Sequence, residues 1–336
     1  MVGKRRNPAD NALPPRVYRG RKNYEFHPPG GGSILLCSLD SPLPVLWAKY
    51  AQVNARKADK KTMAALVAEF FESSYFTRLA ADTQKDYKKN SRRLLPVFGK
   101  MDPDNVKPQH IRKYMDKRGA TSEVQANREK SFLSGVYRWA YERGKVAGNP
   151  CTGVKKFMEI PRDRLITDAE YNAVYAEARE IVKIAMEISY LCLARQSDVL
   201  SLREAQLLEE GIFICQNKTK KKQIKAWSDR LRLVIAMSRA LPLKPGIVST
   251  FVIHQPNGNR YTRDGFNSAW RDAKLAAEEK FPDLNFDFTF HDIKAKGVSD
   301  LEGTLSEKQS ISGHKTQSQT ATYDRKVQIV PVVGNQ

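Results

Sequence analysis

The sequence lacks the features that would assign the chain to a membrane, a metal centre or a disulfide scaffold. No apolar run approaches the length needed to span a bilayer, and no charged-then-apolar leader opens the chain. There is no P-loop, no carboxylate cluster suited to two-metal nuclease chemistry, and no CxxC or Cys/His cluster with zinc spacing. We therefore expect a soluble cytoplasmic protein with no metal or other cofactor. Its widely spaced cysteines are expected to be reduced: Cys37, Cys151, Cys192 and Cys215.

Acidic residues are also comparatively few. The 336-residue chain has 57 Lys and Arg residues against 37 Asp and Glu residues, which gives a formal charge of +20 and a pI near 9.7. A charge of this sign attracts a polyanion, so nucleic acid is the expected partner, and a merely basic protein of ribosomal type is the alternative. The length and a hydrophobic content of 41% suit two or three domains with buried cores.

Three short strand-like runs lie near the amino terminus, at residues 16–18, 23–27 and 33–39. Turn formers separate them, namely Gly20 and the Pro/Gly cluster at 28–32. These runs predict a small three-stranded sheet, which buries little surface and needs support from its neighbours or from a ligand. The alternative is a flexible basic tail with a hairpin.

A helical pattern begins at Thr62 and continues for about eighty residues. One predicted helix has cations at three- and four-residue steps, which places them on one face. This basic stripe consists of Lys85, Lys88, Lys89, Arg92 and Arg93. Residues able to bind phosphate or stack on it stand beside the stripe: Thr83, Gln84, Tyr87 and Asn90. In so basic a chain we interpret the stripe as a DNA contact, although such a stripe is often only a solvated face.

The region from Thr167 onward has candidates for chemistry. Thr167 and Glu170 have the Thr-x-x-Glu spacing of a capping box, so a helix is expected to begin there. A long apolar helix predicted at 181–193 leads directly to Arg195 and Asp198. A buried arginine needs a partner for its charge, so an Arg195–Asp198 ion pair is the structural interpretation of this segment.

Two further stretches combine basic residues with local structure. A strand-like run at 211–215 precedes a lysine cluster at 218–222, at the turn of a predicted hairpin, where lysines commonly make non-specific phosphate contacts. His291 and Lys294 stand at the start of an amphipathic helix, where a lone histidine is commonly structural.

Near the carboxy terminus, His314 follows Gly313 and Tyr323 comes nine residues later. In an unbroken helix rising about 1.5 Å per residue, the two side chains would lie roughly 13 Å apart on opposite faces. They can act together only if the chain bends between them or if two protomers share a site. Gly313 and the polar run at 316–318 can provide the bend.

Taken in order, these segments resemble the tyrosine recombinases, the family of phage integrases. The motifs that carry the resemblance are Leu193-Ala194-Arg195-Gln196-Ser197-Asp198, Asn217-Lys218-Thr219, Phe290-His291-Asp292-Ile293-Lys294, Gly313-His314 and Tyr323-Asp324-Arg325. The resemblance covers about residues 60–326. It is weaker over residues 1–60, where the Leu-Pro-Pro lead-in and Val17-Tyr18 resemble the arm-site DNA-binding domain of the lambda type of integrase. The family pattern has arginine where Lys294 stands, and lysine keeps the charge but loses the two-pronged fork.

The resemblance implies an α+β protein, with a mostly helical catalytic domain containing a small β-sheet, a helical core-binding domain before it, and a small N-terminal three-stranded β domain. The implied domains are an arm-type DNA-binding domain at 1–58, a SAM-like core-binding domain at 59–147, a linker at 148–162, and a catalytic domain with an exchange tail at 163–336. The apolar run at 327–333 would pack onto a neighbouring protomer or fold onto its own domain.

The roles of individual residues also follow from the resemblance. The expected nucleophile is Tyr323. Arg195, Lys294 and His314 would surround the scissile phosphate. His291 would help to take the phenol proton, and Lys218 would be the general acid. Lys220 is the fallback for the general acid, because the register of the lysine cluster is open. Asp198 would orient the arginine, and Lys220 and Lys221 would join the basic stripe in contacting DNA.

The function implied is that of a site-specific recombinase that cleaves and rejoins double-stranded DNA attachment sites through a 3′-phosphotyrosyl intermediate. Such an enzyme would integrate a viral genome, and in some settings excise it, acting as a homotetramer on DNA. It would work in the bacterial cytoplasm near the nucleoid. An accessory DNA-bending or directionality factor is a further expected partner. A type IB topoisomerase is a second enzyme interpretation. A non-catalytic DNA-binding protein on an integrase scaffold is the third, and Lys294 is its only hint.

Overall fold

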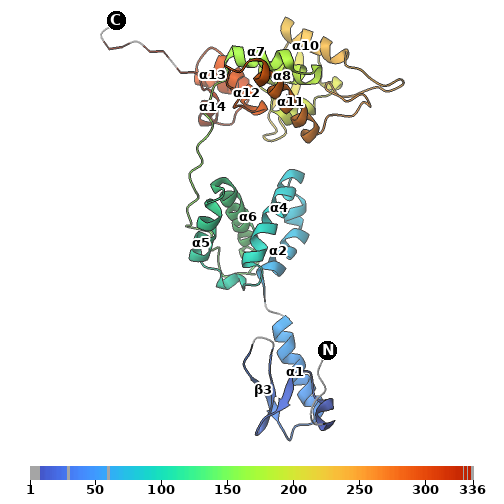
Figure 1. Cartoon of the computed structure of the whole chain (residues 1–336), viewed down its shortest axis with the longest axis vertical. Helices are drawn as coiled ribbons and strands as arrows, with labels where there is room; N and C mark the ends of the chain where they lie inside the picture. The colour runs from blue at the N-terminus through green and yellow to red at the C-terminus, as the bar shows by residue number, and fades with distance from the viewer. Residues whose placement is uncertain (1–7, 29–30, 59–60, 328, 331, 334–336) are drawn as a thin grey trace. The chain divides into compact units, whose positions relative to one another are not determined.

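The computed structural model describes residues 8–28, 31–58, 61–327, 329–330 and 332–333. The chain divides into two compact units, residues 1–159 and residues 160–336 (Figure 1). Each unit has its own hydrophobic core, and the first contains two separate clusters. The α+β class expected from the sequence is confirmed. A search of the described residues for a helix long and apolar enough to cross a membrane finds none.

The amino-terminal strands form the expected three-stranded sheet, in the order β1-β2-β3, and both pairs of strands are antiparallel. Their bounds are β1 Val17–Arg19, β2 Asn23–Phe26 and β3 Ile34–Ser38, after a short 3-10 turn η1 at Pro8–Ala12. A helix that the sequence did not lead us to expect, α1 (Leu43–Ala58), packs beside β3 and buries Leu46 completely (Figure 1). The prolines at the start of α1 read as turn signals, yet proline is well tolerated in the first turn of a helix.

The rest of the first unit is a helical bundle. Its elements are α2 (Met63–Glu72), α3 (Ser74–Thr77), α4 (Ala81–Phe98), η2 (Pro103–Asn105), α5 (Pro108–Gly119) and α6 (Glu123–Tyr141). Helix α6 contacts α2, α4 and α5, and its core side chains include the fully buried Phe132 and Val136. Side-chain caps begin α2 at Thr62 and α6 at Ser122, where each hydroxyl accepts a hydrogen bond from a backbone amide three residues on.

The segment after α6 stays attached to this bundle as far as residue 159. The Asn127 side chain clamps it, because its amide donates to the Phe157 carbonyl oxygen at 2.9 Å and accepts from the Phe157 amide at 2.9 Å. The Arg112 guanidinium lies 4.8 Å from the Phe157 ring centroid. Much of the expected linker at 148–162 therefore packs on the helical unit, and the division between the compact units falls between residues 159 and 160.

The second unit surrounds α8 (Glu180–Cys192) with further helices and carries one hairpin. Its remaining elements are α7 (Asp168–Glu177), α9 (Gln196–Leu200), η3 (Glu204–Gln206), β4 (Gly211–Cys215), β5 (Lys222–Ala226), α10 (Asp229–Arg239), α11 (Arg263–Lys280), α12 (Phe290–Asp300), α13 (Leu305–Ser312) and α14 (Gln317–Tyr323). The apolar helix predicted at 181–193 is confirmed as α8. So is the capping box, in which the Thr167 amide donates to Glu170 Oε2 at 2.9 Å and the Glu170 amide donates to Thr167 Oγ1 at 3.3 Å.

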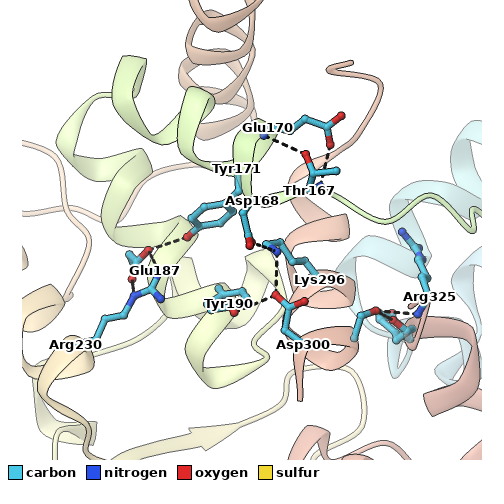
Figure 2. Close-up of polar contacts among 12 residues, drawn as sticks. Thr167, Asp168, Glu170, Tyr171, Glu187, Tyr190, Arg230, Lys296, Asp300 and Arg325 are labelled. Carbon is cyan, nitrogen blue, oxygen red and sulfur yellow. Dashed lines mark hydrogen bonds and ion pairs between the residues drawn. The ribbon is translucent and has the colours of Figure 1, made fainter. Parts of the chain in front are cut away.

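A polar network fixes α12 against α7 and α8 (Figure 2). The Lys296 ammonium, whose residue is 5% exposed, donates to Asp168 Oδ1 at 2.6 Å and to Asp300 Oδ2 at 2.9 Å. The Tyr190 hydroxyl of α8 donates to the same Asp300 carboxylate at 3.0 Å. A buried ammonium is tolerated when it is paired in this way. The network sets the position of α12, whose other side faces the candidate site.

Candidate active site

Arg195 lies where α8 ends and α9 begins. Helix α8 stops because Leu193 adopts a left-handed conformation with φ of 54°, and Arg195 is then the N-cap residue of α9. The expected Arg195–Asp198 ion pair is wrong. Among the contacts of the described residues, Arg195 Nη1 donates instead to Gln216 Oε1 at 2.7 Å, while Asp198 Oδ1 accepts from the Asn217 backbone amide at 2.9 Å. Asp198 therefore holds the start of the hairpin turn and does not orient the arginine directly.

Helix α12 brings His291 and Lys294 to the same face, because residues three apart on a helix are neighbours. Lys294 is completely buried, and its Nζ atom has no hydrogen-bond partner in the part of the chain that the structure describes. That atom lies 5.6 Å from the centroid of the Tyr323 ring. Burial, followed by the charges of Arg195 and Lys225, lowers the pKa of Lys294 to about 7.

The expected bend between His314 and Tyr323 is present. Helix α13 ends at Ser312, Gly313 takes a left-handed φ of 69°, and Thr316 caps α14 by accepting from the Gln319 amide at 3.2 Å. A left-handed turn at a helix end suits glycine best. The rings of His314 and Tyr323 are consequently only 4.6 Å apart between centroids. A single chain thus supplies both groups to one site.

The Tyr323 hydroxyl lies at the centre of the cluster, 2.7 Å from His291 Nε2. Burial raises the pKa of Tyr323, and the charge and hydrogen bond of Arg195 oppose that rise. Partial desolvation is the largest influence on the pKa of His291 and lowers it, against the opposing charge of Asp292. A neutral His291 ring beside a phenol has a free nitrogen lone pair or an N–H, depending on its tautomer.

The residues after Tyr323 anchor it in place. The Ser299 hydroxyl donates to the Tyr323 carbonyl oxygen at 3.1 Å, and Lys308 Nζ pairs with Asp324 Oδ2 at 2.8 Å. Arg325 Nη1 pairs with Asp292 Oδ1 at 2.7 Å, and both side chains are less than 10% exposed. These contacts attach the end of α14 to α12 and α13 of its own unit.

His314 is a second buried group with a free polar atom. Its Nδ1 lies 3.0 Å from Ser312 Oγ and 3.3 Å from Thr320 Oγ1, while its Nε2 has no partner among the described residues. Burial is the largest cause that lowers the pKa of His314 to about 3, and the charges of Lys294 and Arg195 add to it. The ring is therefore neutral at pH 7. Together, the half-buried Arg195 and the buried Lys294 and His314 offer nitrogen atoms suited to an anion.

The structure does not bring the lysines of the hairpin turn into contact with this cluster. Lys218 and Lys220 are exposed, and within the described chain neither side chain makes a hydrogen bond or ion pair. Lys220 adopts a left-handed φ of 58° in the turn. The choice of Lys218 over Lys220 as general acid stays a prediction.

Sequence reasoning missed the polar residues that lie behind the cluster. Gln216 is 4% exposed and contacts Arg195, and Lys225 Nζ donates to the Ile311 carbonyl oxygen. The residue pattern of β5 could have indicated that Lys225 points towards the site. In β5 the inward positions carry Gln223 and Lys225 while Ile224 is exposed, which reverses the pattern of a strand on an apolar core.

The basic stripe of α4 is exposed, as a DNA contact requires, and none of its cations joins an ion pair in the described part of the chain. Two of the polar residues beside it also contact the bundle. The Gln84 amide donates to the Leu79 carbonyl oxygen at 2.8 Å, and the Tyr87 ring packs edge-on against Phe132 at 5.1 Å. Gln84 and Tyr87 therefore also stabilise the bundle, and their part in phosphate binding stays a prediction.

Two family models match the chain. The one described as the Phage integrase family matches residues 163–328, and the one described as the Phage integrase central domain matches residues 63–156. These two matches define the class as that of the tyrosine recombinases. The chain belongs to the phage integrase family.

Individual relatives agree with this assignment. The integrase of Escherichia phage HK022 is 23% identical over 205 residues, which cover 58% of this chain and 56% of that protein, so the chain spans little more than half the length of that relative. A lambda integrase dimer bound to a COC′ core site matches with a TM-score of 0.67 at 17% identity, covering 98% of this chain and 99% of that chain. A lambda integrase tetramer bound to a Holliday junction matches with a TM-score of 0.68 at 16% identity and the same coverage. Identities this low establish a shared fold.

Proposed function

We propose that this chain is a site-specific DNA recombinase that cleaves and rejoins double-stranded DNA through a 3′-phosphotyrosyl intermediate. One observation carries the proposal: the Tyr323 hydroxyl, 2.7 Å from His291, lies among the half-buried guanidinium of Arg195 and the buried nitrogen groups of Lys294 and His314. A phosphodiester that enters this cluster meets donors for its non-bridging oxygens and a nucleophile for its phosphorus. Integration, and excision in the presence of suitable partners, would follow from the same chemistry.

In the proposed cleavage step, the Tyr323 oxygen attacks the scissile phosphorus and the bond from phosphorus to the 5′ oxygen breaks. The phenol proton passes to His291, which the lowered pKa keeps neutral at pH 7 and ready to accept it. The leaving 5′ oxygen takes a proton from Lys218. Rejoining is the reverse reaction, and the phosphotyrosyl bond retains the energy of the broken phosphodiester, so no external energy source is needed.

The cations Arg195 and Lys294 stabilise the transition state, which carries more negative charge than the ground state. Arg195 can present its fork to two oxygens, while Lys294 offers a single point charge in place of the family's second fork. An incoming phosphate favours the charged form of Lys294, because an adjacent anion raises the pKa of an ammonium. The lysine is thus suited to hold charge at the step that needs it, although it supplies fewer hydrogen bonds.

We further propose that the remaining parts of the chain bind DNA and join protomers. The lambda integrase likeness covers 98% of the chain, so the sheet of β1, β2 and β3 is the proposed arm-type domain, and the bundle with its basic stripe is the proposed core-binding domain. Val327, Ile329, Val330, Val332 and Val333 are strongly exposed and lie outside any helix or strand. An apolar tail of this kind suits packing onto a neighbouring protomer in a tetramer. Gln328 and Pro331 of the predicted run lie outside the described residues.

Covalent trapping tests the proposal. The wild type and Tyr323→Phe are incubated with nicked duplexes from the ends of the genetic element that encodes this chain, then resolved on denaturing gels. A protein–DNA adduct that is absent in Tyr323→Phe supports a phosphotyrosyl intermediate, whereas tight binding with no adduct favours a non-catalytic DNA-binding protein. Junction formation between two duplexes separates a recombinase from a type IB topoisomerase.

A further inference from the structure

Gln216 joins three parts of the site through one side chain. It follows β4 directly and is 4% exposed. Its Oε1 atom accepts from Arg195 Nη1 at 2.7 Å and from Thr219 Oγ1 at 2.7 Å, and its Nε2 atom donates to the Ser312 carbonyl oxygen at 3.0 Å. The amide therefore links the arginine at the start of α9, the hairpin turn beside Lys218, and the end of α13 just before His314.

Two side chains of β5 extend the same contact. Gln223 Nε2 donates to the Ser310 carbonyl oxygen at 2.7 Å, and Lys225 Nζ donates to the Ile311 carbonyl oxygen. The last carbonyl groups of a helix lack partners within the helix, and here the hairpin supplies donors to three consecutive ones. The hairpin is thus seated on the carboxy-terminal end of α13.

Gly313 allows this close approach. A Cβ atom at that position would lie 2.5 Å from Gln223 Oε1 and 2.8 Å from Gln216 Nε2, so a side chain there would displace these two amide groups. The glycine is needed both for its left-handed φ and for the space that the hairpin occupies. The loop that carries His314 and the hairpin that carries Lys218 are in direct contact through backbone and amide groups.

We propose that Gln216 is a positioning residue that places the Lys218 turn relative to the phosphate held by Arg195 and His314. The inference rests on the proposed function and deepens it. Lys218 is exposed, so its approach to the leaving oxygen depends on how the turn is held, and general acid catalysis is sensitive to errors of about 1 Å. The turn is held on two sides: Asp198 binds the Asn217 amide, and Gln216 binds Thr219 while it also holds Arg195.

Glutamine suits this role for a chemical reason. An amide oxygen has two lone pairs, and Arg195 and Thr219 use both, while the amide nitrogen supplies the donor that the Ser312 carbonyl needs. A glutamate would lose that donor and place a negative charge beside the arginine, in competition with the phosphate. Methionine has a similar shape and removes all three hydrogen bonds.

The test compares two nicked duplexes of the same sequence, one with the ordinary scissile phosphodiester and one with sulfur in place of the leaving 5′ oxygen. A thiol has a pKa near 8.5, far below the roughly 15.7 of water, so a thiolate departs without a proton donor and cleavage no longer needs Lys218. The proteins are the full-length wild type, Gln216→Met, Lys218→Ala as the reference for a missing acid, and Gln206→Met as the matched control. Gln206 Nε2 donates to the Phe213 carbonyl oxygen of β4 at 2.7 Å, and none of its hydrogen bonds within the described chain reaches a residue of the cluster.

We expect Gln216→Met to slow single-turnover cleavage of the ordinary duplex by about 10- to 100-fold, because misplacing the acid should remove part of the roughly 100- to 10,000-fold that a general acid contributes. Most of that loss should disappear on the sulfur duplex, as it should for Lys218→Ala. Gln206→Met should match the wild type on both. An equal loss on both duplexes, or no loss on either, overturns the inference.

Two controls keep the outcomes separate. If thermal denaturation shows that Gln216→Met does not fold, Thr219→Val replaces it, because this variant removes the hydroxyl contact at the half-buried turn. The inference then fails unless Thr219→Val shows the same recovery on the sulfur duplex. A wild type that forms no adduct on either duplex, or an adduct that persists in Tyr323→Phe, refutes the proposed function. A wild type that forms the adduct while the Gln216→Met loss is insensitive to sulfur refutes only the role of Gln216.

Discussion

The charge state of Lys294 gives the sharpest prediction. Its ammonium is completely buried without a hydrogen-bond partner among the described residues, and its pKa falls from the ordinary 10.5 to about 7. A fall of this size corresponds to about 5 kcal/mol, the cost of holding the charge in the folded protein relative to the unfolded chain. The perturbation is Lys294→Met, which keeps most of the side-chain volume and removes the charge.

The sign of the pH dependence follows from the lowered pKa. Between about pH 7 and pH 10.5 the unfolded chain holds a proton on this lysine that the folded protein has released, so stability rises with pH by about 1.4 kcal/mol per unit. From pH 7.5 to pH 9 the wild type should therefore gain about 2 kcal/mol that Lys294→Met does not gain. Arg195, Lys225 and His314 face the same ammonium and are present in both proteins, so the difference between the two isolates Lys294.

Urea denaturation of the DNA-free full chain at pH 7.5, 8.2 and 9.0 measures this difference. Lys294→Met should be more stable than the wild type at pH 7.5, and the gap should narrow as the pH rises. The matched control is Lys244→Met, because Lys244 is exposed in the same unit and its removal should leave the pH dependence unchanged. Parallel curves for the wild type and Lys294→Met would refute the argument that the buried ammonium titrates near neutrality.

Three further predictions concern the nucleophile, the basic stripe and the tail. Arg325→Met breaks the buried ion pair with Asp292, so it should lower the free energy of unfolding, measured by urea denaturation, by about 3–5 kcal/mol. It should also lower the yield of the covalent adduct at saturating DNA, and an unchanged yield would show that the pair does not hold Tyr323 in place. The double variant Lys89→Ala/Arg92→Ala should reduce the slope of log affinity against log salt by about 1.8 in a gel-shift titration, because each lost phosphate contact removes about 0.9. The control is Lys100→Ala, at an exposed lysine outside the stripe. An equal slope in the wild type and both variants would exclude the stripe from DNA contact. Deletion of residues 327–336 should preserve the adduct on a single nicked duplex but prevent junction formation between two, and junctions formed at the wild-type rate would show that the tail does not join protomers.

The helices and strands that the sequence predicted well are those governed by local chemistry. The capping box at Thr167, the apolar helix α8 and the three amino-terminal strands each depend on residues within one or two turns of each other. The order and spacing of the motifs around Arg195 and Tyr323 were enough to indicate the family, because a family signature is itself a sequence pattern. Helix α1 was missed because its first turn carries a proline that also signals a turn.

The sequence by itself determined which groups are available for chemistry, and the tertiary structure decided what each of them contacts. Nothing near Arg195 in the chain indicates that its partner is Gln216, twenty-one residues on, and not Asp198. The burial of Lys294, which lowers its pKa, results from packing by segments distant in the sequence, and the seating of the hairpin on α13 joins residues nearly a hundred positions apart. Burial and long-range hydrogen bonds depend on how whole elements pack, so the electrostatics of this site become defined only when the helices and the hairpin are assembled around it.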